Sequence, residues 1–298
     1  MTTIITATTI DEVLGEASSR FFGAIYRTAQ QDMSVQFTPR WDGSWDISGK
    51  ASVHYVTSWG ERRGKQRIPH LSTIDAVLML AQLGRKFYDE AFQAGFCSEL
   101  EIINIMHVMV RAGSVPDEDL NNMPVSGELT IEDRAIQARV QIGNMYTIAD
   151  YRVEAGKNQL DSAAIIAEAT PKIGLTDVVI DPAAGRATAT VEIAEPINFL
   201  PGESLLVANI IACSQIGQAL MAMLDEIPRE KSNTLWMRKY EGWVSENSGE
   251  DSLLKAVVVS DEHLLLPVKE EKLSIYNGHG SGCNVDCEYS IAHALPHQ

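Results

Sequence analysis

IPHLSTIDAVLML, residues 68–80, places His70 and Asp75 at the start of a segment that is otherwise apolar. A buried ionisable side chain is costly unless it is paired or used in chemistry. Apolar residues continue well beyond this stretch and predict one long helix over about 73–93, buried around most of its circumference. The sequence therefore predicts a core helix that begins beside two ionisable groups.

Strand-like runs lie on both sides of this helix. Residues 22–38 and 45–58 are rich in aromatic and β-branched residues, and the turn region DGSWDISGK joins them. Three further runs follow the helix at 99–110, 125–133 and 134–153, separated by Gly, Pro and Asp. The order is strands, helix, strands.

The same order recurs from about residue 160. A hairpin-like run at 178–193 precedes a second long apolar helix at 204–224, and strands are expected at 235–244 and 253–260. The pattern predicts an α+β protein with a double hot-dog fold. Its two curved antiparallel sheets would lie side by side as one continuous sheet, each wrapped around a long central helix. An unrelated α+β fold with two similar halves is the alternative.

Length and charge narrow the class of protein. A chain of 298 residues suggests two domains, here an N-terminal hot-dog over 1–158 and a C-terminal hot-dog over 159–298. With 24 basic and 40 acidic residues the formal charge is −16, so neither nucleic acid nor an anionic membrane is an expected partner. The first residues lack a basic region followed by a long apolar run, and we expect a cytoplasmic protein.

Cysteine spacing argues against a disulfide framework and does not complete a metal site. The four cysteines are Cys97, Cys213, Cys283 and Cys287. The last two, with His279 nearby, resemble half of a zinc site, but a second pair of ligands is missing and no metal or bound cofactor is expected. The dipeptide at 277–278, Asn-Gly, is expected to form a hairpin turn.

Two roles fit Asp75. With Ser72 it forms a capping box, in which each side chain bonds a backbone N–H of the other residue, and this role needs no catalysis. Alternatively it is a catalytic base, with Gln82 nearly two turns on along the same helix face. His70 is the other base candidate, because its pKa ordinarily lies close to neutrality; a loop histidine bonded to backbone is the plainer reading.

Substrate-binding candidates come from both helices. Polar residues on the second, otherwise apolar helix either line a pocket or bond helix carbonyls. The Gly202 N–H, at a helix N-terminus, is placed to receive a thioester or ketone oxygen. The predicted substrate-binding residues are Ser72, Gln82, Gly202, Asn209 and Gln215.

One basic cluster stands out in this acidic chain. GERRGKQR, residues 60–67, contains Arg62, Arg63, Lys65 and Arg67 immediately before the first helix. We expect it to dock the phosphates of coenzyme A or of a carrier protein's phosphopantetheine. A solvated turn, favoured by its two glycines, is the alternative.

Two segments resemble acyl-thioester dehydratases. PHLSTIDAVLM is similar to the His-Pro-x-x-x-Asp-Ala segment that opens the hot-dog helix of polyketide dehydratase domains, with His70, Asp75 and Ala76 in matching places. FLPGESLLVANIIACSQIG resembles the Phe-Pro-Gly stretch and Gln-x-Gly helix of single hot-dog dehydratases and of the A-factor biosynthesis family. The matching residues there are Phe199, Pro201, Gly202, Gln215 and Gly217.

The resemblance to dehydratases is incomplete. Ile211 stands where those single hot-dog families place a glutamate, so an acid-catalysed role for the second half is doubtful. None of the seven histidines begins the His-x3-Gly-x4-Pro motif that supplies the base of double hot-dog dehydratases. Dehydration is thereby weakened as a reading.

More of the chain resembles the bacterial avirulence D protein family. The segments DEVLG at 11–15, RFFGAIY at 20–26 and PHLSTIDAV at 69–77 carry this resemblance. It implies synthesis of acylated, sugar-derived signal molecules of the syringolide type from a β-ketoacyl thioester and a ketose.

Together these features predict an acyltransferase-like enzyme that condenses a β-ketoacyl group with a hydroxylated small molecule. Acyl-CoA or an acyl carrier protein would be the donor, and Asp75, with His70, would take the proton of the attacking hydroxyl. A dehydratase or isomerase of β-hydroxyacyl thioesters and a non-catalytic acyl-binding module are the alternatives.

Overall fold

The computed structural model describes residues 3–59, 61–62, 65–93, 101–132, 135–155, 170–193, 201–227, 235–245, 254–268 and 271–295. The N-terminal segment contains β1 (Ile5–Thr9), α1 (Ile10–Leu14) and the short 3-10 helices η1 (Ala17–Ser19) and η2 (Ile25–Thr28). The first half then contributes β2 (Ala29–Pro39), β3 (Trp45–Tyr55), β4 (Glu61–Arg62), β5 (Lys65–Gln66), α2 (Thr73–Gln93), β6 (Glu101–Arg111), β7 (Met123–Glu132), β8 (Ala135–Ile142) and β9 (Met145–Ala155). The second half contributes β10 (Ile173–Asp181), β11 (Arg186–Ile193), α4 (Gly202–Leu224), β12 (Trp236–Val244), β13 (Lys255–Val268), β14 (Glu271–Gly282) and β15 (Val285–Ala294).

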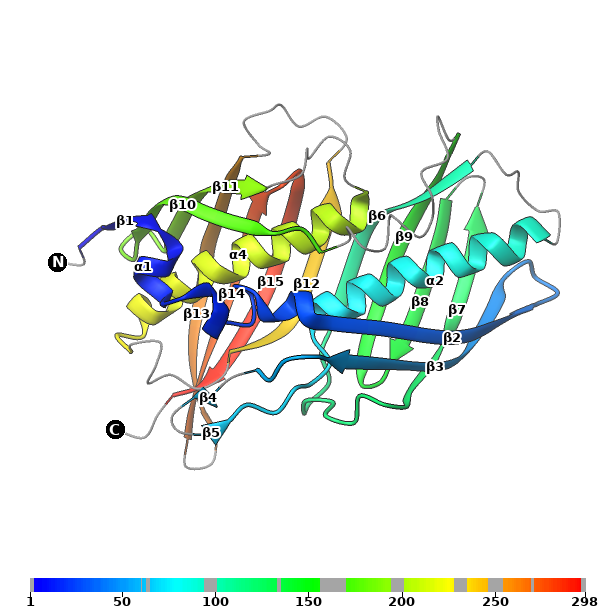
Figure 1. Cartoon of the computed structure of the whole chain (residues 1–298), viewed down its shortest axis with the longest axis horizontal. Coiled ribbons are helices and arrows are strands. Elements are labelled where there is room, and N and C mark those ends of the chain that lie inside the picture. Colours follow the sequence, from blue (N-terminus) through cyan, green and yellow to red (C-terminus); the bar gives the residue numbers. More distant parts are fainter. Residues whose placement is uncertain are drawn as a thin grey trace.

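Thirteen of the described strands form one antiparallel sheet (Figure 1). The strands follow the order β1-β10-β11-β13-β14-β15-β12-β6-β9-β8-β7-β3-β2. The halves meet where β12 pairs with β6, with Tyr240 opposite Val110. The fold is thus α+β and hot-dog-like: a large antiparallel sheet with few helices.

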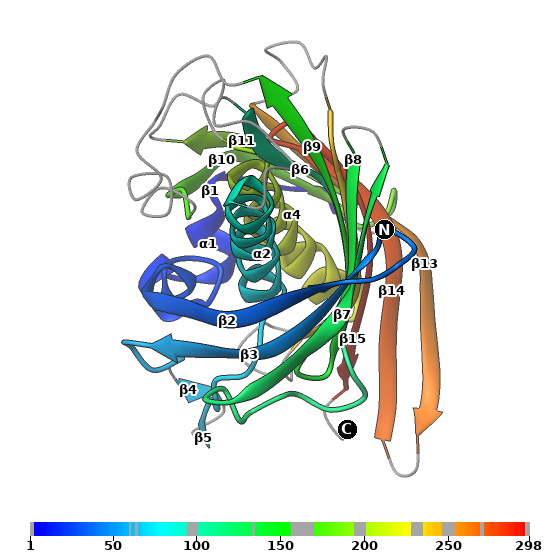
Figure 2. The same ribbon diagram turned by 90° about the vertical axis from the view of Figure 1, so that its right-hand side faces the viewer.

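Both long helices lie on the same side of the sheet, which curves around them (Figure 2). α2 packs against β2, β6 and β9, whereas α4 packs against β10, β11, β13 and β14. Alternate strand residues face the helices, as in β8, where Ile136, Ala138, Val140 and Ile142 are buried. The core therefore lies between the helices and the concave face of the sheet.

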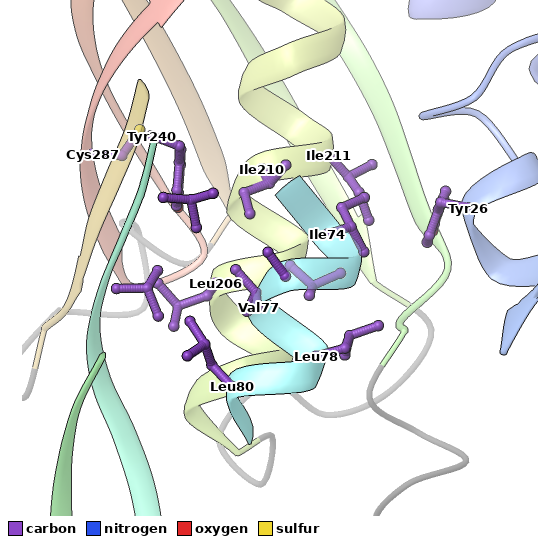
Figure 3. Packing of buried hydrophobic residues seen from close by; sticks show 14 of the residues in the cluster. Tyr26, Ile74, Val77, Leu78, Leu80, Leu206, Ile210, Ile211, Tyr240 and Cys287 are labelled. Atoms are coloured by element: carbon purple, nitrogen blue, oxygen red, sulfur yellow. The ribbon is translucent and has the colours of Figure 1, made fainter. Parts of the chain in front are cut away.

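The two helices also pack on one another and run antiparallel. The two helices are in contact, and Figure 3 shows Ile74 and Val77 of α2 and Leu206 and Ile210 of α4 among the buried side chains there. Among the helices that the structure describes, α4 is long and apolar enough to cross a membrane, yet 89% of its most apolar window is buried inside the protein. Its low amphipathicity reflects burial on all sides rather than insertion into lipid.

Close packing explains the first residue of α4. A Cβ added to Gly202 would lie 2.0 Å from the backbone oxygen of Ile105 in β6. Just after it, the buried carboxylate of Glu203 accepts a hydrogen bond from Arg85 of α2 at 2.5 Å. This ion pair joins the two helices at the end away from the start of α2.

Most expected elements are found close to their expected positions. The helix expected over 73–93 is α2, and the second expected helix is α4, which begins two residues earlier than expected. The strand-like run expected within 22–38 is β2, which occupies the second part of that range. Residues 25–28 form η2, and the strand β2 begins at Ala29.

The hairpin turn expected at Asn277-Gly278 is wrong. Both residues lie inside β14, where Asn277 pairs with Glu262 and with Ser290. The turn instead lies at Cys283 and Asn284, whose φ angles are 57° and 60°. Such a turn needs positive φ at both central residues, which Asn-Gly would have supplied more readily than Cys-Asn.

The boundary expected between residues 158 and 159 lies outside the described residues, and the division into two domains stays a prediction. The N-terminal segment crosses to the second half, where Ile5 of β1 pairs with Ile180 of β10. Tyr26 also donates a hydrogen bond to the backbone oxygen of Pro171 at 2.6 Å. Residues that precede β2 in sequence therefore complete the sheet around α4.

Candidate functional site

A pocket of about 90 Å³ lies where the start of α2 meets the second half of α4. The N-terminal segment, the loop after β6, the β8–β9 turn and the start of β12 close its sides. Its polar lining residues are Arg20, Arg67, His70, Ser72, Thr73, Asp117, Asn144, Gln215, Gln218 and Arg238. Aromatic walls come from Phe21, Phe22, Trp59 and Trp236.

Asp75 lies directly behind this pocket and does not line it. The residue is 1% exposed. Its Oδ2 accepts hydrogen bonds from the Tyr55 hydroxyl at 2.5 Å, the Ser72 hydroxyl at 2.6 Å and the Ser72 N–H at 3.0 Å. Its Oδ1 accepts a bond from Gln31 Nε2 at 2.7 Å.

The capping box is present, because the Asp75 N–H also donates to Ser72 Oγ at 3.1 Å. Burial nevertheless raises the pKa of Asp75, although the bonds from Ser72, Tyr55 and Gln31 act in the opposite direction. A carboxylate with a raised pKa is a stronger proton acceptor than an exposed one. Ser72, which lines the pocket, is the only one of its three bonding partners in that lining.

His70 lines the pocket beside Ser72. Its Nδ1 lies 3.2 Å from the backbone oxygen of Ile68, and its ring packs on Trp59 with 4.5 Å between centroids. Burial lowers the pKa of His70, so the neutral imidazole is favoured at pH 7. The loop bond to backbone expected as the plainer reading is therefore present, while the ring still faces the pocket.

Trp59 has a polar group that the described residues do not satisfy. Its side chain is 2% exposed and lines the pocket, yet its indole Nε1–H has no hydrogen-bond partner among the described residues. A buried donor without an acceptor costs free energy. The nitrogen atom is enclosed by protein, so a bound molecule would reach it only if the neighbouring side chains moved.

Arg20 joins the N-terminal segment to α4. Its guanidinium donates to Gln215 Oε1 at 2.5 Å and forms an ion pair with Asp11. The Arg20 side chain is 3% exposed, so it positions Gln215 inside the protein rather than on its surface. Gln215, which the sequence singled out, thus lines the same pocket as His70 and Ser72.

The other predicted substrate-binding residues lie elsewhere. Asn209 is buried; it donates to the backbone oxygens of Gly282 and Val285 and accepts from Tyr240. Gln82 donates to the backbone oxygen of Gln31 at 3.2 Å. Neither residue is among those that line the pocket, nor is Gly202.

The basic cluster lies close to the pocket through one of its members. Arg67 lines the pocket and lies 5.5 Å from the centre of the Trp59 ring. Arg62 and Lys65 are paired in the β4–β5 ribbon, and Arg63 lies outside the described residues.

The residues considered for zinc do not form a ligand set. His279 Nδ1 bonds Asp261 at 2.8 Å on the surface, whereas Cys283 and Cys287 are buried free thiols. In the part of the chain that the structure describes, no three His, Cys, Asp or Glu side chains are grouped to hold a metal ion.

Several pocket residues were not expected from the sequence. Arg20, Trp59, Asp117 and Arg238 come from four separate segments, and only the fold brings them together. RFFGAIY, one of the segments carrying the family resemblance, contains Arg20, Phe21 and Phe22. The resemblance of that segment to the family was the signal in the sequence that could have pointed to these three pocket residues.

The chain matches a known protein family. The family model described as Pseudomonas avirulence D protein (AvrD) matches residues 6–168 and 166–252. No curated protein matches the chain by sequence.

Solved structures resemble the chain at low identity. A tesB protein from Mycobacterium avium subsp. paratuberculosis is 9% identical with a TM-score of 0.45, covering 85% of this chain and 94% of its own. The acyl-CoA thioesterase II TesB2 from Mycobacterium marinum is 8% identical with a TM-score of 0.43, covering 92% and 99%. The dehydratase domain of PpsC from Mycobacterium tuberculosis, solved with C12:1-CoA, is 10% identical with a TM-score of 0.39, covering 87% and 97%.

Proposed function

Because the chain belongs to the avirulence D protein (AvrD) family, we propose that it is an enzyme that transfers a β-ketoacyl group from a thioester to a hydroxylated small molecule. The fold that we infer is a double hot-dog, with α2 and α4 as its central helices. The product would be an acylated, sugar-derived signal molecule of the syringolide type. The family supports this reaction, and the pocket at the start of α2 is the proposed place where it occurs.

The observation that carries the proposal is the pairing of an unsatisfied donor with base candidates in one pocket. The buried indole N–H of Trp59, which has no partner among the described residues, would donate to a substrate oxygen once substrate binding opens the space beside it. His70 faces the same space as a neutral imidazole, and Asp75 lies one hydroxyl away, behind Ser72. Acyl transfer to an alcohol needs a donor for the developing oxyanion and an acceptor for the alcohol's proton.

The roles follow from these positions. The first amides of α2 and the Trp59 N–H support the carbonyl oxygen of the thioester. His70 takes the proton of the attacking hydroxyl and returns it to the leaving thiolate. Gln215, held by Arg20, offers polar contacts to a hydroxylated acceptor. Ring closure of the β-keto ester would follow in the same pocket.

The donor would carry phosphates on coenzyme A or on a carrier protein. Arg67 lies at the pocket and belongs to the one strongly basic stretch of an acidic chain. Arginine binds phosphate through paired N–H groups. We propose that this stretch receives the donor from a cytoplasmic pool.

Release of free thiol tests the proposal. The purified protein is mixed with acetoacetyl-CoA, with and without each of a panel of ketoses, and free thiol is followed over time. Acyl transfer predicts continuous thiol release that depends on the ketose. A dehydratase, an isomerase or an acyl-binding module would release none, and that result would contradict the proposal.

A further inference from the structure

Asp75 is buried behind the pocket and has no direct contact with the space where a substrate would bind. The carboxylate is 1% exposed and is not among the lining residues, so a bound molecule in the pocket does not touch it. Ser72 lines the pocket, and its hydroxyl donates to Asp75 Oδ2 at 2.6 Å. A base that is to act on the substrate must therefore act through Ser72.

We propose that Ser72 is a nucleophile, and that the acyl group passes through a covalent ester on its Oγ. This inference rests on the proposed acyl-thioester function and assigns a chemical role to a residue that otherwise only caps α2. A serine hydroxyl that donates to a base is the usual arrangement of an activated nucleophile. Here Asp75 fills the position of the base.

The environment of the pair supports this assignment. Tyr55 and Gln31 hold the carboxylate from its other sides, so its orientation toward Ser72 is fixed. Burial raises the pKa of Asp75 and so increases its affinity for the proton that Ser72 would release. Thr73 also brings a hydroxyl to the pocket lining, and Ser72 is the one that donates to a carboxylate.

The reaction balances in two steps. In the first, Ser72 Oγ attacks the thioester carbonyl, its proton passes to Asp75, and the carbon–sulfur bond breaks, so that the thiolate leaves and takes a proton from solvent. In the second, the acceptor hydroxyl attacks the Ser72 ester with His70 taking its proton, and Asp75 returns its proton to Ser72 Oγ as the new ester leaves. His70 then gives its proton to solvent, which balances the proton taken by the thiolate. No oxidant, reductant or metal is consumed.

The experiment uses the full chain and acetoacetyl-CoA. The mixture without acceptor is quenched in acid within milliseconds to seconds, and intact mass and peptide mapping locate any acyl adduct. We expect one acetoacetyl group on Ser72 and a burst of about one thiol per chain. Ser72→Ala should lose the adduct, and Asp75→Asn should slow the burst about 100-fold or more.

Ser72→Cys guards against a trivial loss of folding. It keeps a nucleophile in place and should form an acyl adduct at the same position, now a thioester that neutral hydroxylamine cleaves. Melting temperatures of all variants are measured on the same preparations. A merely structural Ser72 would move the melting temperature but yield no adduct in either wild type or Ser72→Cys.

Steady-state kinetics separates this inference from the proposed function. A Ser72 ester predicts parallel double-reciprocal lines when donor and acceptor concentrations are both varied. Intersecting lines with no adduct, while thiol release still depends on the ketose, would overturn the nucleophile and leave the proposed function standing. Absence of thiol release and of adduct with every ketose would overturn both.

Discussion

Asp75→Asn separates the structural and the chemical role of the carboxylate. The wild-type side chain accepts four hydrogen bonds, three at Oδ2 and one at Oδ1. An asparagine oxygen at the Oδ2 position can keep the bonds from Tyr55 and Ser72. Its NH₂ group would then face Gln31, whose side-chain amide can turn over and accept instead. The substitution thus preserves the number of bonds and removes the charge.

The expected change in stability is small. Each bond to a charged group contributes about 1 kcal/mol more than a neutral bond, so four such bonds amount to about 4 kcal/mol. Against this, burying an ionised carboxylate costs several kcal/mol, and the raised pKa of Asp75 indicates that burial outweighs the bonds. The free energy of unfolding at pH 7 should change by about 1 kcal/mol or less. A positioned base contributes about 10² to 10⁴ in rate, so kcat should fall about 100-fold or more.

The assay measures urea unfolding and kcat on the same preparations. Tyr55→Phe is the matched control: it removes one donor, leaves the carboxylate in place, and should cost about 1–3 kcal/mol of stability with a smaller loss of kcat per folded molecule. The reasoning is refuted if Asp75→Asn turns over like wild type. A large loss of stability with unchanged activity per folded molecule would likewise assign Asp75 to structure alone.

Three other substitutions test the fold and the pocket. Gly202→Ala should lower the free energy of unfolding, measured by urea titration, by about 1–3 kcal/mol, because its Cβ would lie 2.0 Å from the backbone oxygen of Ile105. Gly217→Ala is the control and should raise that free energy by up to about 1 kcal/mol, because its Cβ would lie 3.8 Å from the Val258 side chain. Equal effects of the two substitutions would contradict the close packing at Gly202. Trp59→Phe removes the unsatisfied N–H and should raise KM for the thioester at unchanged or higher melting temperature; an unchanged KM would remove Trp59 from the site. The lowered pKa of His70 means that, as pH falls through about 6.5, the unfolded chain binds a proton that the folded protein resists. The melting temperature of the wild type should therefore fall more steeply than that of His70→Gln between pH 7 and pH 5. Identical slopes would show that the pKa of His70 is not lowered in the folded protein.

The sequence predicted the long helices and most strands, because their signals are local. The apolar run after Ser72 ends near Gln93, where α2 ends, and alternation along β8 marks its buried face. The placement of β1 beside β10 was not expected. That pairing joins residues about 170 positions apart, and no local pattern records which half a short terminal strand will join.

The pocket residues predicted from the sequence are mostly close together in the chain, and Gln215 of α4 is the exception. His70, Ser72 and Asp75 lie together because the capping box fixes the chain at the start of α2. Asn209 and Gln82 were expected in a pocket and instead bond backbone oxygens of neighbouring strands. A polar residue on an apolar helix can either bond such buried backbone groups or bind a substrate, and the sequence pattern is the same for both. Trp59 and Arg238 reach the pocket from separate segments, so only the tertiary structure shows that they line it.

The most direct test of acyl transfer is the mass of what the protein makes. Purified wild-type protein and Asp75→Asn are incubated with acetoacetyl-CoA labelled in the acyl group and with a ketose, and the small molecules are analysed by mass spectrometry. Our account predicts a labelled product that contains both the acyl group and the ketose, formed by the wild type and about 100-fold or more slowly by the variant. Recovery of only labelled thioester, free acid or a dehydrated or isomerised acyl group would contradict it.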